Sequence, residues 1–167
     1  MIFAALADEH LNLLFQFELE NRVWFESLIA ARANEFYSKK SVKSHIEHCI
    51  SAAKRGKNYS GVLINNGVIV ARANLKDINN HHHTSFVGYR VAKNSIGKGY
   101  ASFCLSELIE KAKVLYSVKL LKAQVLDNNP ASKNVLTKQG FKAVDHEADF
   151  TELDGRKFNC TRYHLVL

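Results

Sequence analysis

Apolar positions in the first part of the chain recur at helical spacing. In the segment DEHLNLLFQFELENRVWFESLI, which starts at Asp8, steps of three and four residues place several apolar side chains on one helix face. These side chains belong to Leu11, Leu14, Phe15 and Leu19. A second helix is predicted over residues 41–53, with Ser41 as its N-cap. We therefore expect two amphipathic helices before the first long strand.

The pattern then changes to β-rich runs. Two such runs in NYSGVLINNGVIVARANL flank Asn66-Gly67, a dipeptide that accepts the positive φ angles of a type I′ turn, so a hairpin is predicted. The next strand is predicted in TSFVGYRVA. Its interior residue Gly88 indicates a β-bulge or a close approach of another group to the backbone.

Helical spacing returns in SIGKGYASFCLSELIEKAKVLY, where two glycines come just before an amphipathic run. Its apolar positions step by four, three, four and three residues, which is typical of a helix face packed on a sheet. These positions are Ala101, Leu105, Leu108, Ala112 and Leu115. The following run, KLLKAQVL, predicts a buried strand.

The last part of the chain is predicted to contain a short helix and two strands. NNPASKNVLTKQG has the residues of a capped helix that stops at Gly140. Strands are predicted near residues 141–150 and 161–167, joined by a turn at Asp154-Gly155. The order of elements is helices, a hairpin, then strand–helix–strand–helix–strand–strand. This order predicts a mixed α/β (α+β) fold rather than a doubly wound sheet.

Composition is that of an ordinary folded protein. Of 167 residues, 47% are hydrophobic and 23% are charged, so we expect one domain over residues 1–167. No apolar run approaches the roughly 18 residues of a membrane span, and MIFAALADEH lacks the features of a signal peptide. Cys49, Cys104 and Cys160 are widely spaced, which favours reduced thiols. We therefore expect a cytoplasmic protein with no membrane partner.

The formal net charge of +7 favours anionic partners. Nucleic acid, a ribosomal surface and a polyanionic small molecule all fit this charge, and so does a merely soluble basic surface. The chain has no RNA-binding aromatic motif and no block of five consecutive basic residues. We therefore expect no direct binding to nucleic acid.

The glycine pair before the amphipathic helix suggests a phosphate site. Gly97-Lys98-Gly99 does not fit a P-loop, which needs Gly-Lys-Ser/Thr after a four-residue gap from an earlier glycine. A dinucleotide fingerprint would need a third glycine where Ser102 stands, at the start of a βαβ unit. The remaining interpretation is that backbone N–H groups at the positive end of the helix bind a pyrophosphate.

Two motifs resemble those of the GNAT superfamily of acetyl-CoA-dependent N-acetyltransferases. The family signature Gln/Arg-x-x-Gly-x-Gly/Ala corresponds here to IGKGYA, with Ile96 where Gln or Arg is usual. The downstream segment NNPASKNVLTKQGFKAV resembles the family pattern Asn-x-x-Ser-x-x-Val/Leu-x-x-x-x-Gly-Phe. The N-terminal helices and VGYRVAKNSIGKGYA are similar to the ribosomal-protein alanine N-acetyltransferase branch. The resemblance covers nearly the whole chain, although the usual first strand is short or absent.

The resemblance implies a GNAT-type mixed, mostly antiparallel sheet, splayed in its middle, with helices on both faces. It also implies acetyl-CoA as the acyl donor. The cofactor contacts implied are the main chain of Tyr89, Arg90 and Val91, the loop residues Ile96, Gly97, Lys98, Gly99, Tyr100 and Ala101, and Asn129 with Ser132. For the strand residues an ordinary place in the sheet is the alternative, and Asn129 is also expected in the N-cap region of the following helix. For Lys98 a solvated side chain is an equal alternative, and for Tyr100 packing is the stronger one.

Two residues are predicted to be catalytic. By resemblance Ser132 faces the sulfur and acts as the general acid, or as a hydroxyl that stabilises the thiolate. A carboxylate with a raised pKa, or a water that it holds, would serve as the base, and Glu147 and Asp145 are the candidates. The C-terminal strands match the family only in part, because Asn159 and Cys160 occupy its Asp-His positions. Tyr163 matches, with core packing as its expected role.

The histidine run His81 to His83 predicts a loop rather than a metal site, because adjacent side chains of an extended chain point to opposite faces and no Asp, Glu or Cys cluster is near. We expect no metal. The expected acceptor is a primary amine, most of all the N-terminus of a ribosomal protein, attacked directly by a monomer or homodimer. A small-molecule amine and a non-catalytic module that senses acyl-CoA or binds the ribosome remain alternatives.

Overall fold

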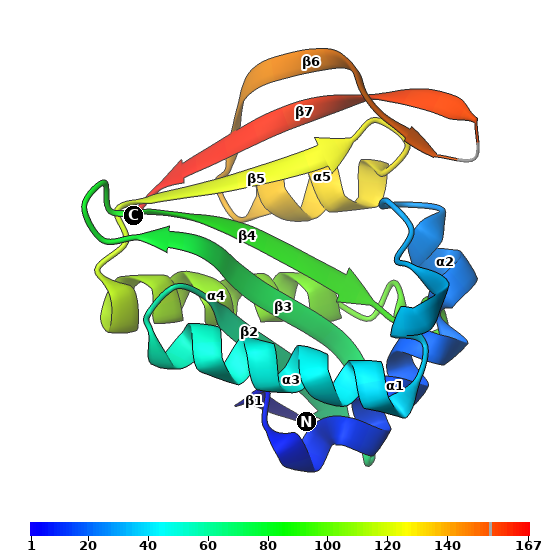
Figure 1. Ribbon diagram of the computed structural model, residues 1–167. Helices are drawn as coiled ribbons and strands as arrows, with labels where there is room; N and C mark the ends of the chain where they lie inside the picture. Colours follow the sequence, from blue (N-terminus) through cyan, green and yellow to red (C-terminus); the bar gives the residue numbers. More distant parts are fainter. Residues whose placement is uncertain (154) are drawn as a thin grey trace.

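Seven strands form one sheet within residues 1–153 and 155–167, the ranges that the computed structural model describes (Figure 1). The strands are β1 (Ile2–Ala5), β2 (Tyr59–Asn65), β3 (Val68–Asn79), β4 (Thr84–Val91), β5 (Leu120–Leu126), β6 (Lys142–Leu153) and β7 (Arg156–Val166). Their order is β1-β2-β3-β4-β5-β7-β6. Neighbours are antiparallel except β4 and β5, which are parallel. The predicted mixed, mostly antiparallel sheet is therefore confirmed.

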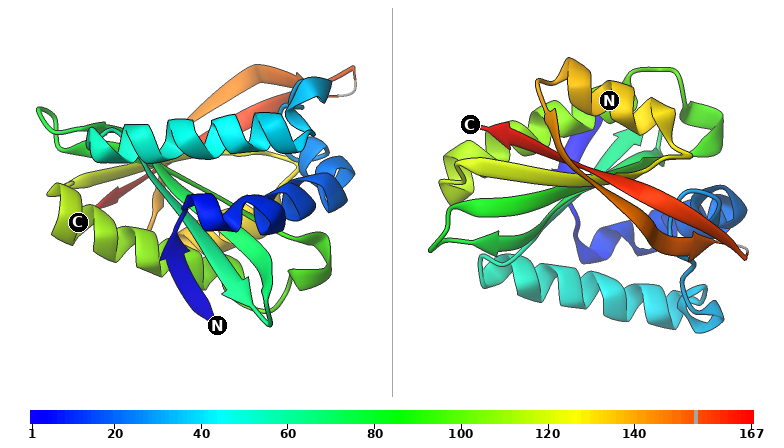
Figure 2. Two further views of the ribbon diagram at one scale, coloured as in Figure 1. Left: turned by 60° about the horizontal axis from the view of Figure 1, so that its bottom comes forward. Right: turned by 90° about the horizontal axis from the view of Figure 1, so that it is seen from above.

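Helices cover both faces of this sheet, as predicted (Figure 2). One face carries α1 (Leu11–Glu20), α2 (Arg22–Glu26) and α3 (Lys39–Lys54), and the other carries α4 (Tyr100–Tyr116) and α5 (Pro130–Lys138). Short 3₁₀ helices lie at Asp8–His10, Asn34–Phe36 and Lys93–Ser95. Successive strand residues face opposite sides, so Val62 belongs to the core under α1 and α3, whereas Leu63 belongs to the core under α4.

The N-terminal helical region differs from the prediction in two places. The predicted single helix from Asp8 is divided, because the Asn21 side chain donates to the Phe17 carbonyl and accepts from the Lys93 amide. The second helix starts earlier than predicted. Its N-cap is Ser38 and not Ser41, since the Ser41 amide donates to the Ser38 hydroxyl. Strand β1 is present and short, with four residues paired to β2.

The predicted hairpin is confirmed, with Asn66 at φ 50° and Gly67 at φ 77° between β2 and β3. Of the two alternatives predicted for Gly88, the β-bulge is wrong: Gly88 pairs regularly with Asn74, and the irregularity lies between Lys76 and Asn79. A Cβ on Gly88 would have no heavy atom within 4 Å. Gly88 therefore borders open space, which is compatible with the approach of a ligand to the backbone.

Two C-terminal expectations also change. Leu115 was expected on the packed face of α4, but it is 60% exposed, and in the last turn of the helix Tyr116 packs against the core instead. Strands β6 and β7 extend further than predicted and pair along most of their length. The predicted turn residue Asp154 lies outside the described residues.

The parallel pair β4 and β5 separates in the middle of the sheet. The two strands pair only through residues 84–86 and 120–122. Beyond that point β4 continues along β3 to Val91, and β5 continues along β7 to Leu126. The predicted splay is therefore present, and Figure 1 shows the two strands diverging toward the N-terminal end of α4.

Candidate functional site

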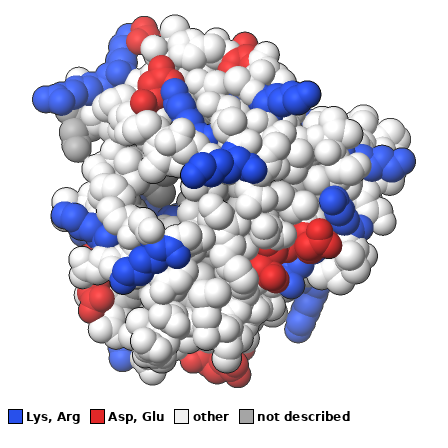
Figure 3. Space-filling view, turned by 180° about the vertical axis from the view of Figure 1, so that it is seen from behind, with Lys and Arg blue, Asp and Glu red and all other residues white. Residues whose placement is uncertain are grey.

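A cleft of about 850 Å³ occupies the space between the diverging strands. Its walls are β4 and β5, the loop before α4, helix α5, and α2 with the residues that follow it. Viewed from the face opposite to that of Figure 1, the surface is hollowed, with Lys and Arg side chains at the rim of the hollow (Figure 3). The splay of the sheet thus forms an open channel that can be reached from outside.

One end of the cleft is made of main chain. Gly97 and Gly99, which line it, have φ angles of 75° and 79°, in the left-handed region that favours glycine. A Cβ on either residue would have no heavy atom within 4 Å, so backbone conformation and not crowding requires glycine here. Gly99 is also the N-cap residue of α4. The first N–H groups of this 17-residue helix have no intrahelical partner, so the loop can bind an anion.

Of the other predicted loop residues, three line the cleft and Lys98 does not. Ile96 and Ala101 line the cleft, and Ile96 is 52% exposed. Tyr100 also lines it, while its ring packs on the core and its hydroxyl accepts a hydrogen bond from Asn65 (3.2 Å). Lys98 is exposed, and its Nζ donates to the Asn94 carbonyl within the loop (3.2 Å). The structure therefore brings the predicted loop residues together except for the Lys98 side chain.

Strand β4 offers main-chain groups to the cleft. Residues 89–91 lie past the last pairing with β5 and are paired to β3 alone. Their side chains alternate: the Tyr89 hydroxyl reaches α5, whereas the Arg90 guanidinium reaches Glu18 of α1. On the β5 side, the backbone of this segment thus faces the cleft rather than a neighbouring strand.

Ser132 and Tyr89 connect the two arms of the splay. The Tyr89 hydroxyl lies 3.0 Å from the Ser132 hydroxyl and donates to the Ser132 carbonyl at 3.2 Å. Burial raises the pKa of Tyr89 to about 12, so its hydroxyl stays protonated at neutral pH. Asn129 is the N-cap of α5, and its Oδ1 accepts from the Ser132 amide (3.1 Å). All three residues line the cleft.

The two carboxylates predicted as candidate bases lie elsewhere. Glu147 and Asp145 are on β6, and both form ion pairs with Arg162 of β7. Neither residue lines the cleft. Asp77 is the one carboxylate among the described residues that line it. No sequence pattern indicated Asp77, because it lies at an irregularity of β3 with φ 51°.

The remaining C-terminal residues and the histidines lie in the core, in the β6–β7 hairpin or in a turn. Tyr163 is buried in the core, as expected, and Cys160 is buried on β7. The Asn159 side chain accepts from the Asp149 amide within the β6–β7 hairpin. His81 and His82 lie in the turn between β3 and β4, which confirms the predicted loop. Within the described residues, no group of His, Cys, Asp and Glu could hold a metal, and no helix is long and apolar enough to cross a membrane.

The N-terminal helices contribute a wall that the sequence patterns did not predict. Residues of α2 and the segment after it line the cleft, namely Trp24, Phe25, Leu28 and Ile29. The Trp24 indole donates to the Val91 carbonyl (3.2 Å), and the Asn128 side chain donates to the Ser27 carbonyl (3.0 Å). This segment therefore contacts both the end of β4 and the turn after β5.

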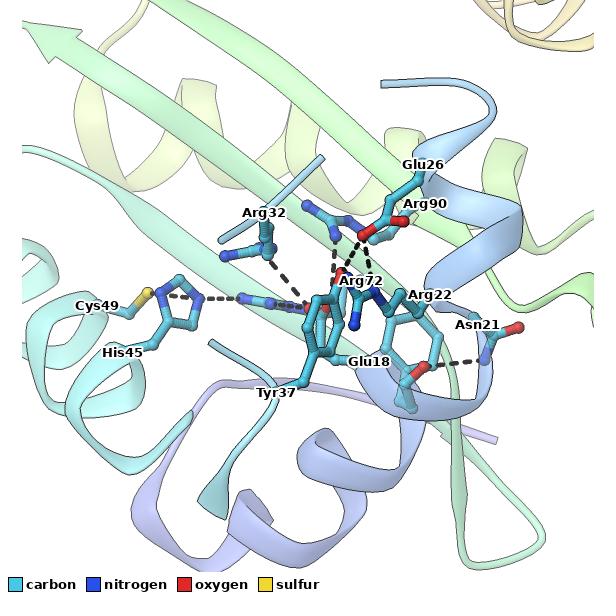
Figure 4. Close-up of polar contacts among 11 residues, drawn as sticks. Glu18, Asn21, Arg22, Glu26, Arg32, Tyr37, His45, Cys49, Arg72 and Arg90 are labelled. Carbon is cyan, nitrogen blue, oxygen red and sulfur yellow. Dashed lines mark hydrogen bonds and ion pairs between the residues drawn. The ribbon is translucent and has the colours of Figure 1, made fainter. Parts of the chain in front are cut away.

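A buried ionic cluster adjoins this wall (Figure 4). The Glu18 side chain is fully buried, with Arg72 Nη1 2.6 Å from Oε1 and Arg90 Nη1 3.1 Å from Oε2. Arg32 Nη2 lies 3.8 Å from Oε1. Burial opposes ionisation of Glu18, but the three guanidiniums outweigh it and hold the pKa of this carboxyl below its ordinary value. One signal was available: Arg72 and Arg90 are lone charges within apolar strand runs.

The charges of the same cluster help to lower the pKa of two neighbouring side chains, His45 and Lys76. Burial and then the charges of Arg72 and Arg32 lower the pKa of His45 to about 3, so this imidazole is neutral at neutral pH. Its Nε2 accepts from Arg72 Nη2 (3.1 Å). Lys76 is reached by solvent from the cleft, yet the surrounding protein and the charges of Arg90, Arg32 and Arg72 lower its pKa.

Comparison with family models places residues 1–142 in a model described as an acetyltransferase (GNAT) domain. Comparison with curated proteins gives no match. Many solved structures share the fold. A ribosomal-protein-S5-alanine acetyltransferase from Vibrio fischeri has a TM-score of 0.93 and 16% identity, over 98% of this chain and 91% of that one.

Two other structures are informative about the range of proteins with this fold. A ribosomal L7/L12 alpha-N-protein acetyltransferase in complex with coenzyme A has a TM-score of 0.90 and 17% identity, over 99% of this chain and 93% of that one. A spermidine N-acetyltransferase mutant from Vibrio cholerae has a TM-score of 0.79 and 15% identity, over 99% and 95%. At these identities the likeness concerns the fold.

Proposed function

Because the chain belongs to the GNAT acetyltransferase family, we propose that it moves an acetyl group from acetyl-CoA to the N-terminal amine of a protein. Acetyl-CoA is the acyl donor. Ribosomal proteins are the first acceptors to examine, because two structures with the same fold are named for acetylation of ribosomal proteins. The proposal treats residues 1–167 as one N-acetyltransferase domain, since β7 at the C-terminal end pairs with β5 in the same sheet.

The observation that carries the proposal is the position of the glycine loop at the open end of the splay. Gly97, Gly99 and the N-terminal end of α4 face the cleft that β4 and β5 enclose. A pyrophosphate fits the loop because backbone N–H groups and the helix dipole both favour an anion there. The attached pantetheine arm would extend along residues 89–91, whose main chain faces the cleft.

The chemistry needs the thioester and the amine held together, with the leaving sulfur near a proton donor. The amine nitrogen forms a bond to the acetyl carbon while the carbon–sulfur bond breaks and the sulfur takes a proton. Ser132 serves as the hydroxyl near the sulfur, and Tyr89 positions it through their 3.0 Å contact. Both hydroxyls are poor acids, so they stabilise a thiolate and relay a proton through water rather than donate one freely.

The amine must reach the cleft without its extra proton. Glu147 was expected to act as the base, but its pairing with Arg162, away from the cleft lining, leaves it poorly placed. In this proposal a water molecule takes the proton from the amine. The Asp77 carboxylate, which lines the cleft, binds this water and stabilises the proton on it. Attack is direct, without an acyl-enzyme.

The test combines binding with turnover. Coenzyme A binding is measured by calorimetry, and thiol release from acetyl-CoA is followed with peptides carrying ribosomal-protein N-terminal sequences and with spermidine. We expect coenzyme A to bind and peptides to be acetylated faster than spermidine. Binding without turnover on any amine would favour a non-catalytic acyl-CoA module, and faster turnover of spermidine would favour a small-amine acetyltransferase. Absence of binding would reject the proposal.

A further inference from the structure

Three rows of cross-strand neighbours form the floor of the cleft on the side of α1 and α2. On this face of the sheet Arg72 pairs with Arg90, Asn74 with Gly88, and Lys76 with Phe86. Rows two residues apart along a strand are separated by about 7 Å. Arg90, Asn74, Gly88 and Lys76 all line the cleft. This face is distinct from the glycine loop, which lies at the N-terminal end of α4.

The charges of this floor do not balance. Glu18 is the one carboxylate in ion-pair contact with Arg32, Arg72 and Arg90 among the described residues, so the cluster carries two formal positive charges. Lys76 adds a third, and Asp77 of the same cleft offsets one charge without forming an ion pair with Lys76, so two formal positive charges remain among the described residues. Charges in partly buried positions are normally paired. The excess therefore favours an anion supplied from outside.

The members of the cluster differ in their freedom to bind that anion. Arg72 is 3% exposed, and its two terminal nitrogens contact Glu18 and the neutral His45. Arg90 is 19% exposed, contacts Glu18 through Nη1 alone and lines the cleft. The ring of Phe25 lies 5.1 Å from its guanidinium carbon. Among the cations of this floor, Arg90 and Lys76 thus line the cleft, and Arg72 holds Glu18, the carboxylate that Arg90 contacts.

A hydrogen-bonding group accompanies these cations. The Asn74 side chain lies in the row between Arg90 and Lys76, and its Oδ1 is buried without a hydrogen-bond partner among the described residues. A buried amide oxygen without a partner costs free energy, so a donor from a bound molecule would be favourable there. An ammonium or amide N–H of the acceptor would satisfy it. The floor thus offers a hydrogen-bond acceptor, the Asn74 Oδ1 atom, between the two cations.

We propose that this floor binds an acceptor whose amine is accompanied by a carboxylate, with the carboxylate held by Arg90 and Lys76 and an N–H group held by Asn74. The inference rests on the part of the proposed function that transfers an acetyl group from acetyl-CoA to a primary amine, and it defines the acceptor by its charge. The carboxylate comes either from the main chain of a free amino acid or from an acidic side chain next to a peptide N-terminus. A polyamine, which brings only positive charge, does not fit this floor.

The experiment measures binding of matched probes to the protein saturated with coenzyme A. One pair is alanine and alaninamide. The other pair is two tripeptide amides that begin with alanine and have aspartate or asparagine in the second place. We expect the carboxylate member of at least one pair to bind about 10-fold more tightly, as for hydrogen bonds to charged groups. The pair that shows the preference identifies the source of the carboxylate.

A variant series assigns the preference to the floor. Lys76→Gln removes the cation that solvent reaches, and we expect it to reduce the preference about 3-fold. Lys113→Gln makes the same change on the exposed side of α4 and should leave the preference intact. Arg90→Lys keeps the charge but loses the fork of guanidinium donors, so it should weaken the preference without removing Glu18's partner.

Equal affinities within both pairs would overturn the inference, and so would tighter binding of spermidine than of either carboxylate probe. A preference that survives Lys76→Gln and Arg90→Lys unchanged would also overturn it. These results leave the proposed function standing if coenzyme A binds and neutral amines are acetylated. Failure of coenzyme A to bind the unmodified protein would instead reject the proposed function, and the inference with it.

Discussion

The two ends of the cleft are built by different means. At the glycine loop, φ angles of 75° and 79° and the start of α4 present main-chain groups to the cleft. At the other end, which we propose binds the acceptor and call the acceptor end, side chains from α1, α2, β3 and β4 form the wall and the ionic cluster around Glu18. The first end depends on backbone conformation within one short segment. The second depends on charges from segments up to 72 residues apart.

This difference explains why one end is suited to binding the donor and the other to discriminating among acceptors. Backbone N–H groups recognise a phosphate whatever side chains surround them, so the loop is suited to a ligand that is recognised by its phosphate groups. Side-chain charges discriminate among acceptors, because a mismatched charge costs free energy in a partly buried site. Changes at the loop should therefore abolish donor binding, whereas changes in the cluster should alter stability and acceptor choice.

The largest expected effect comes from a charge placed in the loop. Gly99→Glu puts a carboxylate where the pyrophosphate is proposed to lie, and like charges held together cost several kcal/mol. We expect the dissociation constant for coenzyme A to rise about 1,000-fold in calorimetry. Gly67→Glu is the matched control, because Gly67 has a similar φ of 77° in the exposed β2–β3 turn. Unchanged affinity in Gly99→Glu would remove the loop from the donor site.

The next effect concerns the other end of the cleft. Glu18→Gln leaves three guanidiniums without their carboxylate, and breaking a buried ion pair from one side costs about 3 kcal/mol. Urea unfolding should show this loss in the free energy of unfolding. Glu20→Gln, an exposed change on the same helix, should cost less than about 0.5 kcal/mol. Equal stability of the two variants would show that the cluster does not stabilise the fold.

The contrast between the two ends also explains what the sequence could predict. The loop is contiguous, so its glycines, the helix that follows and the downstream Asn129 to Ser132 segment were recognisable in one stretch each. Their positions in the cleft follow from local rules: positive φ at Gly99 and an N-cap bond from Asn129 to the Ser132 amide. The hairpin at Asn66-Gly67 was predictable for the same reason.

The acceptor end could not be predicted, because no local pattern connects Glu18 to Arg72 and Arg90. These residues meet only when α1 packs on β3 and β4, a long-range arrangement. Glu147 shows the converse: its position on β6 was foreseen, but its partner Arg162 on the neighbouring strand was not. The division of the first helix at Asn21 likewise depends on the distant Lys93 amide.

A third prediction concerns the pH dependence of stability, which we expect to come from His45 beside the Glu18 cluster. The folded-state pKa of His45 is lowered to about 3, so below pH 6.5 the unfolded chain binds a proton that the folded protein does not. Stability should therefore fall as pH decreases from 6.5, by about 2 kcal/mol at pH 5. Urea unfolding at pH 7.5 and pH 5 measures this change. The His45→Gln variant should lose this part of the pH dependence, and an equally steep decrease in that variant would place its origin elsewhere.

The smallest expected effect lies where the two ends meet. Tyr89→Phe removes the hydroxyl that lies 3.0 Å from Ser132 Oγ and keeps the ring that packs against the core. If Tyr89 positions the Ser132 hydroxyl near the sulfur, kcat should fall about 10-fold, the value of one hydrogen bond of about 1.4 kcal/mol, while KM for the acceptor changes little. Tyr116→Phe, on the last turn of α4 and outside the cleft lining, is the control.

An increase in the acceptor KM at unchanged kcat would instead connect Tyr89 to acceptor binding. Because Tyr89 and Arg90 are adjacent on β4 but point to α5 and α1 respectively, that outcome would mean that the donor and acceptor ends are coupled through the strand they share.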